Sequence, residues 1–291
     1  MKSSPGQKFR HALASEKPLQ IVGTVNAYTA MMAQQMGFRA IYVSGAGVSN
    51  VSYGLPDLAM TTLDNVLEDV RRISSAVTLP ILVDIDTGWG NQLMIARTVR
   101  EMIKAGAAAV HIEDQVFNKR CGHRPGKKIV SCEEMQERIR IAVRTKQEED
   151  DSFMIMARSD ALATEGLEGL LKRVIAYQEA GAEMIFVEAM QSLEQYSAVK
   201  RALGIPILAN ATEFGITPIW ELKQFAEAEV DCVLYPLTVA RAMNLAAFNT
   251  LKSLREQGSQ KGFLDKLQSR EELYRFLDYY SYEEKAGKDE R

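Results

Sequence analysis

The feature that most constrains this chain is an alternation of short apolar runs with longer segments of helical character, which repeats eight times. The apolar runs occupy residues 19–25, 40–44, 81–85, 110–113, 153–157, 184–188, 206–209 and 231–235. They are nearly continuous rather than alternating in polarity, which is typical of strands in a parallel sheet covered on both faces. The pattern therefore predicts eight parallel strands.

Glycines mark the points at which helical segments end. Ala105-Gly106-Ala107 and Ala180-Gly181-Ala182 each lead from a helical segment into an apolar run, as glycines at helix C-termini do. The clearest helical segments are residues 63–75, 92–104, 133–144 and 167–179. Eight β–α units in roughly 250 residues predict a (β/α)₈ barrel of the TIM type. An open, doubly wound sheet is the alternative, because it is built from the same units.

The end of the chain exceeds what a barrel needs. No linker or change of composition divides the sequence, so we expect one barrel domain over residues 1–291, with residues 245–291 as a C-terminal helical extension. Residues 264–280 carry apolar side chains at helical spacing and predict one long apolar-faced helix. We expect this helix to pack on a neighbouring subunit; packing on its own barrel is the alternative.

Charge and cysteine content exclude several classes of partner. The net charge of −3 gives no reason to expect nucleic acid binding. No apolar run approaches the roughly 20 residues that a membrane span needs. Three cysteines are too few, and odd in number, for a disulfide framework. We therefore expect a cytoplasmic protein that binds neither nucleic acid nor a membrane.

Polar side chains stand where the predicted strands end. They are Tyr42, Ser44, Asp84, Asp86, His111, Glu113, Arg158, Asp160, Glu188, Asn210 and Thr212. In (β/α)₈ barrels, chemistry gathers at the C-terminal ends of the strands. Because buried polar groups need partners, this convergence predicts a functional site at that end.

Three carboxylates from neighbouring strands form a candidate metal site. Asp84, Asp86 and Glu113 supply hard oxygen donors, which suit Mg²⁺ or Mn²⁺. Gly88 and Gly90 follow closely and leave room for a ligand. The alternative is a set of carboxylates that pair with Arg158 and Lys119.

A basic segment after the fourth strand contains the most reactive candidate side chain. It reads Lys119-Arg120-Cys121-Gly122-His123. Cations and an imidazole beside a thiol favour its thiolate form, which makes Cys121 a candidate catalytic residue. Arg124-Pro125-Gly126 then turns the chain, so the segment reads as a loop. The alternative is a solvated basic turn with an incidental cysteine.

Positive charge near the strand ends indicates an anionic substrate. Arg158 and Arg241 can grip carboxylates with two hydrogen bonds each, and Lys119, Arg120 and His123 add further charge. This number of cations beside a metal implies a substrate with more than one carboxylate, or a phosphate. Backbone amides of Gly45-Ala46-Gly47 could hold a carboxylate.

These segments together resemble the isocitrate lyase and phosphoenolpyruvate mutase superfamily, and in particular its lyases. The resemblance extends from residue 26 to about residue 285. It rests on the Lys119–His123 segment and on Asp84-Ile85-Asp86-Thr87-Gly88, Asn210-Ala211-Thr212-Glu213-Phe214-Gly215, Tyr235-Pro236-Leu237 and Arg241-Ala242-Met243-Asn244. Ala46 and Val187 depart from residues common in the family, glycine and proline, and leave substrate choice open.

The resemblance implies a role for each site residue. The metal, Mg²⁺ or Mn²⁺, would be held by Asp84 and Asp86 with Glu113 beside them. The catalytic set would be Cys121, Tyr42, His123, Lys119 and Arg120, with Cys121 as the general acid and Tyr42 as a candidate base. The substrate contacts would be Ser44, Gly45, Ala46, Gly122, Arg158, Glu188, Asn210, Ala211, Thr212, Arg241 and Arg270, with Phe186, Leu234 and Pro236 as an apolar wall.

The implied activity is cleavage of 2-methylisocitrate to pyruvate and succinate, a step of propionate catabolism through the 2-methylcitrate cycle. Residues 117–128 would close over the site and exclude water. The family resemblance also implies a homotetramer with swapped C-terminal helices. The alternatives are a related enzyme acting on dimethylmalate, oxaloacetate or isocitrate, and a barrel that binds a dicarboxylate and regulates without turnover.

Overall fold

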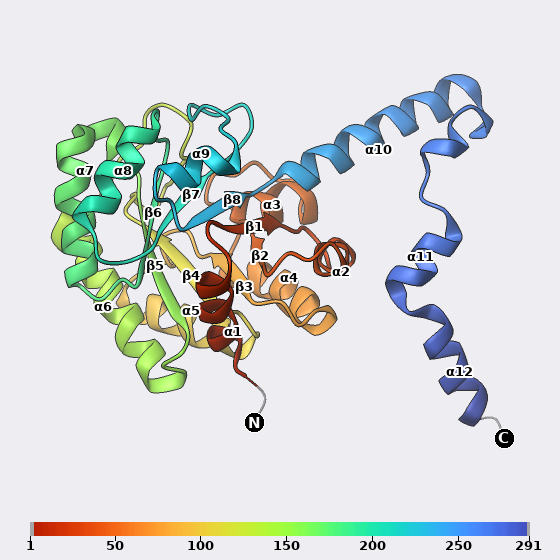
Figure 1. The fold of residues 1–291 in the computed structure, drawn as a ribbon, viewed down its shortest axis with the longest axis horizontal. Helices are drawn as coiled ribbons and strands as arrows, with labels where there is room; N and C mark the ends of the chain where they lie inside the picture. Colours follow the sequence, from red (N-terminus) through yellow and green to blue (C-terminus); the bar gives the residue numbers. More distant parts are fainter. Residues whose placement is uncertain (1–2, 290–291) are drawn as a thin grey trace. The chain divides into compact units, whose positions relative to one another are not determined.

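Eight parallel strands close into a barrel in the computed structural model, which describes residues 3–289 (Figure 1). Each strand pairs with the next, and β8 pairs back on β1. The strands are β1 Leu19–Gly23, β2 Ala40–Val43, β3 Ile81–Asp84, β4 Ala109–Glu113, β5 Met154–Ser159, β6 Met184–Val187, β7 Ile207–Asn210 and β8 Cys232–Tyr235. All eight predicted strands are present, and closure confirms the barrel over the open sheet.

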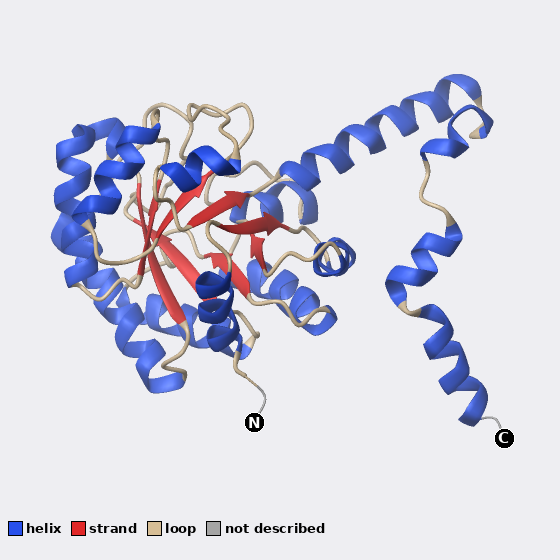
Figure 2. Cartoon of the chain, in the orientation of Figure 1, coloured by secondary structure: helices blue, strands red, loops and turns tan. Residues whose placement is uncertain are grey.

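Helices surround the strands, which Figure 2 shows at the centre. They are α1 Pro5–Ser15, α2 Ala27–Gln35, α3 Gly45–Gly47, α4 Leu63–Ala76, α5 Gln92–Lys104, α6 Cys132–Glu149, α7 Leu162–Glu179, α8 Leu193–Ala202 and α9 Leu222–Glu227, with a π-helical turn η1 at Val48–Ser52. Helix α10 Thr238–Gln257 follows β8. The prediction for α5 is correct at both ends. Helix α7 begins five residues earlier than predicted and is kinked at Gly166, whose φ is 67°.

Side chains alternate between two apolar layers along each strand. Ile21 faces an inner cluster inside the barrel, whereas Val22 faces the outer layer between strands and helices. Phe9 of α1 is fully buried in the inner cluster. Arg10 of the same helix donates to the carbonyl oxygen of Ser152, just before β5, at 2.9 Å. Helix α1 therefore closes the N-terminal end of the barrel with apolar side chains and leaves polar chemistry to the other end.

The chain divides into two compact units, Met1–Ala240 and Arg241–Arg291. The second unit contains the rest of α10, the 3₁₀ turn η2 Lys261–Lys266, α11 Arg270–Leu277 and α12 Tyr279–Asp289. The single long helix expected over residues 264–280 is therefore wrong. Ser269 starts a new helix by accepting a hydrogen bond from the Glu272 amide at 3.1 Å, and Asp278 ends it in the left-handed region at φ 53°.

The described part of the chain bears on two expectations about its surroundings. Within residues 3–289 no helix combines the length and the apolar character needed to cross a membrane. Cys121, Cys132 and Cys232 all carry free thiols, which agrees with the absence of a disulfide framework. The cytoplasmic location stays a prediction.

Closure of the barrel depends on a glycine at the end of β1. A Cβ atom on Gly23 would lie 1.8 Å from the carbonyl oxygen of Pro236, so Gly23→Ala must push β1 and β8 apart. We expect this variant to lower the free energy of unfolding by about 3 kcal/mol, measured by urea denaturation. The control is Gly204→Ala, whose nearest neighbour would lie 3.8 Å away and which should change little. Equal losses in the two variants would contradict this reading.

Candidate functional site

Polar side chains from the carboxyl ends of the strands line one cavity of about 70 Å³. Its lining comprises Tyr42, Ser44, Ala46, Asp57, Asp84, Lys119, Arg120, Cys121, Gly122, His123, Arg158, Phe186, Glu188, Asn210, Thr212, Leu234, Pro236 and Leu237. The loop that carries Cys121 thus supplies five consecutive lining residues. Ligand pockets usually measure about 300–1,000 Å³, so the cavity is smaller than a typical ligand pocket with the loop in this position.

Two aspartates meet at the end of β3. Asp84 Oδ2 accepts a hydrogen bond from the Gly45 amide at 3.2 Å, and its Oδ1 accepts one from the Asp86 amide at 3.0 Å. Asp86 adopts a left-handed backbone conformation with φ 46°, which is costly for a non-glycine residue and typical of functional sites. Both carboxylates lie near the position of a Cβ atom on Gly45, Asp84 Oδ2 at 3.0 Å and Asp86 Oδ1 at 3.3 Å.

Burial makes the ionised forms of Asp86 and Glu113 costly. Burial, assisted by Asp84, raises the pKa of Asp86 to about 6. Burial also raises the pKa of Glu113, with Arg158 opposing it. Glu113 Oε1 is buried and accepts no hydrogen bond from the residues described. An unsatisfied carboxylate oxygen of this kind beside two aspartates fits a divalent cation.

The carboxylates of the site cannot by themselves complete the coordination of a divalent cation, which needs further oxygen ligands such as water or substrate. Among residues 3–289 no three His, Cys, Asp or Glu side chains form a ready-made metal cage. A Mg²⁺ ion usually keeps several waters and takes only one or two carboxylates, so a site of this kind suits it. The alternative pairing is also present in part, because Lys119 Nζ lies 2.9 Å from Asp86 Oδ1 and Arg158 Nε lies 3.4 Å from Glu113 Oε2.

Lys119 bridges Asp86 and a residue that the sequence reasoning missed. Its ammonium also donates to Asp57, which lies in the loop between η1 and α4. Burial lowers the pKa of Lys119, but Asp86, Asp57 and Asp84 together hold it above its usual value. The only sequence signal for Asp57 is a carboxylate in a loop that follows a barrel strand.

Arg158 stands among three carboxylates at the end of β5. Its guanidinium lies 3.0 Å from Asp160 Oδ2 and 3.0 Å from Glu188 Oε2. Glu188 Oε1 also accepts a hydrogen bond from the side-chain nitrogen Nδ2 of Asn210 at 3.3 Å. Burial raises the pKa of Glu188, but Arg158 and His123 overcome that effect and hold it well below its usual range.

The loop that carries Cys121 lies directly against Arg158 and Glu188. His123 Nδ1 accepts a hydrogen bond from the Ile216 amide at 3.0 Å, so the ring proton belongs on Nε2, which faces Glu188 Oε1 at 2.9 Å. A Cβ atom on Gly122 would lie 2.4 Å from Glu188 Cγ, and one on Gly215 would lie 2.6 Å from His123 Nδ1. Both glycines are therefore needed for the loop to approach this closely.

Comparison with known proteins identifies the family. The family model described as phosphoenolpyruvate phosphomutase matches residues 9–255. A 2-methylisocitrate lyase of Vibrio cholerae is 56% identical over 98% of this chain and 94% of its own length. The chain belongs to the phosphoenolpyruvate phosphomutase family. A 2-methylisocitrate lyase of Escherichia coli is 55% identical over 97% of this chain and 95% of its own length.

Solved structures of similar proteins share the fold. Oxaloacetate acetylhydrolase, solved with 3,3-difluorooxalacetate, superposes with a TM-score of 0.91 at 32% identity, over 98% of this chain and 97% of that one. Phosphonopyruvate hydrolase, solved with oxalate and Mg²⁺, superposes with a TM-score of 0.85 at 28% identity, over 97% of each chain. These matches confirm the superfamily resemblance.

Most of the residues predicted from the family resemblance come together in the barrel cavity. All five predicted catalytic residues line it, as do Ser44, Ala46, Gly122, Arg158, Phe186, Glu188, Asn210, Thr212, Leu234 and Pro236. Gly45, Asp86, Glu113 and Ala211 do not line it; the first three contact lining residues as described, and the Ala211 amide donates to the Leu234 carbonyl oxygen at 2.8 Å. Arg241 in α10 and Arg270 in α11 belong to the second unit, so their roles stay predictions.

Tyr42 and His111 form a buried pair inside the barrel. The Tyr42 hydroxyl lies 2.9 Å from His111 Nε2. Burial lowers the pKa of His111 to about 4, so the imidazole is neutral at neutral pH. Burial also raises the pKa of Tyr42, with Asp84 adding to the effect. Tyr42 is therefore a neutral hydrogen-bonding group in this state, which does not favour the predicted role as a base.

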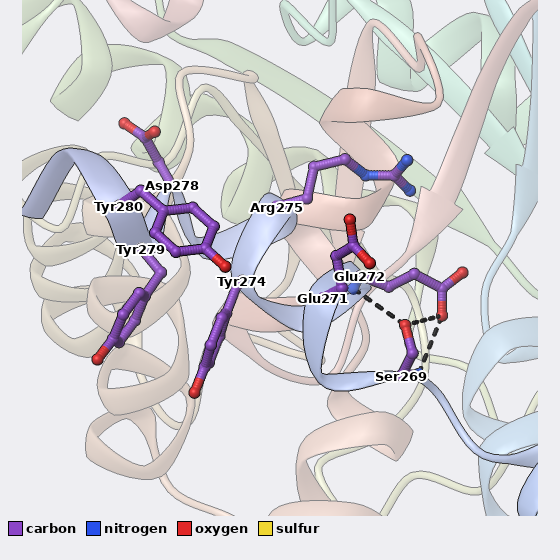
Figure 3. A pocket seen from close by; sticks show the side chains of 8 residues that line it. All are labelled: Ser269, Glu271, Glu272, Tyr274, Arg275, Asp278, Tyr279 and Tyr280. Carbon is purple, nitrogen blue, oxygen red and sulfur yellow. Dashed lines mark hydrogen bonds between the residues drawn. The ribbon is translucent and has the colours of Figure 1, made fainter.

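A larger hollow in the second unit is lined by none of the residues predicted for the site. It measures about 420 Å³ and is lined by Ser269, Glu271, Glu272, Tyr274, Arg275, Asp278, Tyr279 and Tyr280 (Figure 3). The rings of Tyr274 and Tyr279 stack at 4.2 Å between centroids. No residue at a strand end lines this hollow, so the barrel cavity is the candidate site of the family's chemistry.

Proposed function

We propose that this chain is a 2-methylisocitrate lyase, which splits 2-methylisocitrate into pyruvate and succinate. The observation that carries the proposal is the identity of 56% to a lyase of that name over nearly the whole chain. The cavity supports it with buried carboxylates for a cation, a buried arginine for carboxylates and an accessible thiol. A regulatory barrel without turnover would have no need for these groups together.

The substrate carboxylates would bind at the rim formed by β5 to β7. Arg158 can hold one carboxylate with two hydrogen bonds, and Asn210 and Thr212 line the same cavity. Ser44 and the amides of Gly45 and Ala46 would hold another carboxylate at the end of β2. Phe186, Leu234 and Pro236 supply the apolar wall for the methyl group.

Asp84 and Asp86 would hold Mg²⁺, with Glu113 beside them. When bound, the ion supplies Lewis-acid polarisation of the hydroxy-acid oxygens of the substrate. Asp57 gives Lys119 a second carboxylate partner. Asp86 can therefore turn to a cation without leaving the buried ammonium unpaired.

The carbon–carbon bond would break in a retro-aldol sense. The hydroxyl loses its proton and its carbon becomes the carbonyl of pyruvate, while the bonding electrons stay on the carbon that becomes part of succinate. Cys121 then donates its proton to that carbon as a general acid. The loop of residues 117–128 excludes water, which would otherwise compete as a proton donor. Tyr42 stays the candidate for taking the hydroxyl proton, although its burial does not favour that role.

Substrate choice is tested by measuring product release from four compounds in parallel: 2-methylisocitrate, isocitrate, 2,3-dimethylmalate and oxaloacetate. We expect the highest kcat/KM with 2-methylisocitrate. Isocitrate should be poorer by about 10- to 200-fold, because one missing methyl group loses about 1–3 kcal/mol of binding in the transition state. A higher kcat/KM with any of the other three compounds would overturn the assignment.

The same assay tests the proton donor through a matched pair of variants. Cys121→Ser should lower kcat by about 10²- to 10⁴-fold, because a serine hydroxyl is a much weaker acid than a thiol. Cys132→Ser, a change of the same size in α6 and away from the cavity lining, should keep the parent kcat. Parent-like turnover of Cys121→Ser would remove Cys121 from the mechanism.

Metal binding is tested by thermal unfolding as well as by activity. A ligand at 100 times its Kd stabilises the folded chain by about 2.7 kcal/mol, so Mg²⁺ should raise the Tm of the parent. EDTA removes the proposed Lewis acid and should abolish turnover. Asp86→Asn should lose the Mg²⁺-dependent shift. Asp69→Asn alters a buried carboxylate of α4 that accepts from Ser52 at 2.5 Å, and it should keep the shift. Turnover that persists in EDTA would rule out the metal.

We further propose a homotetramer with swapped C-terminal helices. The second unit supports it, because Leu245, Phe248 and Leu251 of α10 are 62%, 65% and 67% exposed. An apolar surface of this kind is typical of an interaction site. Sedimentation velocity should give a tetramer mass for the parent and a smaller species for Phe248→Glu, with Lys252→Gln on the same helix as the control. A monomeric parent would refute the proposal.

A further inference from the structure

The loop that carries Cys121 is pinned where it leaves and re-enters the barrel. Gln115 and Ile129 form an antiparallel bridge, and the Val116 amide donates to the Lys128 carbonyl oxygen at 3.0 Å. Between these points Cys121 is exposed, whereas Gly122 and Lys127 are buried. The bridge between Gln115 and Ile129 is several residues away from Cys121. Contacts closer to Cys121 are therefore needed to fix the backbone around its thiol.

Gln115 fixes the backbone on the N-terminal side of Cys121. Its side-chain nitrogen donates to the Arg120 carbonyl oxygen at 2.9 Å, and its side-chain oxygen accepts from the Arg120 amide at 3.0 Å. Both polar atoms of this buried amide are thus used on one residue of the loop. Arg120 directly precedes Cys121, so one side of the thiol is held.

Lys127 fixes the backbone on the other side. Its ammonium donates to the Gly122 carbonyl oxygen at 2.6 Å and to Asp160 Oδ1 at 2.8 Å. Only 8% of Lys127 is exposed, and a buried ammonium is stable only when it is paired. The lysine therefore ties the residue after Cys121 to the end of β5.

Asp160 is a rigid anchor for that tie. Its amide donates to Asp114 Oδ1 at 2.8 Å, and Asp114 Oδ2 accepts from Ser159 at 2.7 Å and from the Tyr177 hydroxyl at 2.9 Å. The carboxylate of Asp160 also accepts from Arg158 at 3.0 Å. Asp160 therefore makes two links. It holds the loop by way of Lys127, and it contacts Arg158, the proposed substrate arginine, directly.

We propose that Lys127 is a positioning residue, which holds the Gly122 carbonyl against Asp160 and thereby fixes Cys121 over the cavity when the loop is closed. This inference rests on the proposed lyase function and adds a residue to it. Lys127 does not line the cavity, so it acts through the loop and not on the substrate. Misplacement of a reacting group by about 1 Å can cost about 100-fold in rate, so losing the tie should be visible in turnover.

The test compares Lys127→Met with Lys128→Met, the same change at the exposed neighbour. We expect Lys127→Met to lower kcat about 10- to 100-fold, and to speed hydrogen exchange of the amides in residues 117–126. Exchange in β3 and β5 and the Mg²⁺-dependent rise in Tm should match the parent. Lys128→Met should leave kcat and loop exchange unchanged.

Two further measurements keep the proposal open to refutation. If Lys127→Met fails to fold, Lys127→Arg replaces it; this variant keeps the charge and should retain most loop protection with a smaller loss of kcat. Parent-like kcat together with parent-like loop exchange in Lys127→Met would overturn the proposal. If the parent turns over none of the four compounds, the lyase function fails, and the loop exchange of the two methionine variants still decides whether Lys127 holds the loop.

Discussion

Among the buried cations of the site, the guanidinium of Arg158 is the one on which the most carboxylates depend. It lies 3.0 Å from Asp160, 3.0 Å from Glu188 and 3.4 Å from Glu113. Three buried carboxylates without such a partner would carry a large desolvation cost. Arg158 therefore allows acidic groups at the ends of β4, β5 and β6 to gather within one apolar-walled barrel. The loop packs on the same ions, because Gly122 leaves space for Glu188 and Arg158 where a side chain would collide.

The barrel could be predicted because its signal is local and repeated. Each strand of four to six residues is buried on both faces, so its apolar run is visible without knowledge of its neighbours. The C-terminal helix was mispredicted because spacing alone does not show where a helix is interrupted. The cap at Ser269 and the left-handed Asp278 override a continuous apolar pattern, and both are single-residue effects.

The site was predictable where its residues lie at strand ends and less so elsewhere. Asp84 and Glu188 follow from their position, because the carboxyl ends of parallel strands meet at one end of a barrel. Asp57, Gln115 and Lys127 lie in loops, and each matters only through a partner distant in sequence or through burial. A lone lysine in a basic loop reads as solvated, and only the structure shows that Lys127 is buried and paired with Asp160.

Helix α1 closes the N-terminal end of the barrel, and this has a consequence for how substrate and products reach and leave the site. Phe9 and the rest of the inner cluster fill the barrel from that end. In the described part of the chain the cavity therefore opens at the opposite end, where the segment that carries the Cys121 thiol lies. The substrate must enter, and both products must leave, through that same opening. Where such a segment opens more slowly than the bond is broken, its opening sets the upper limit on turnover.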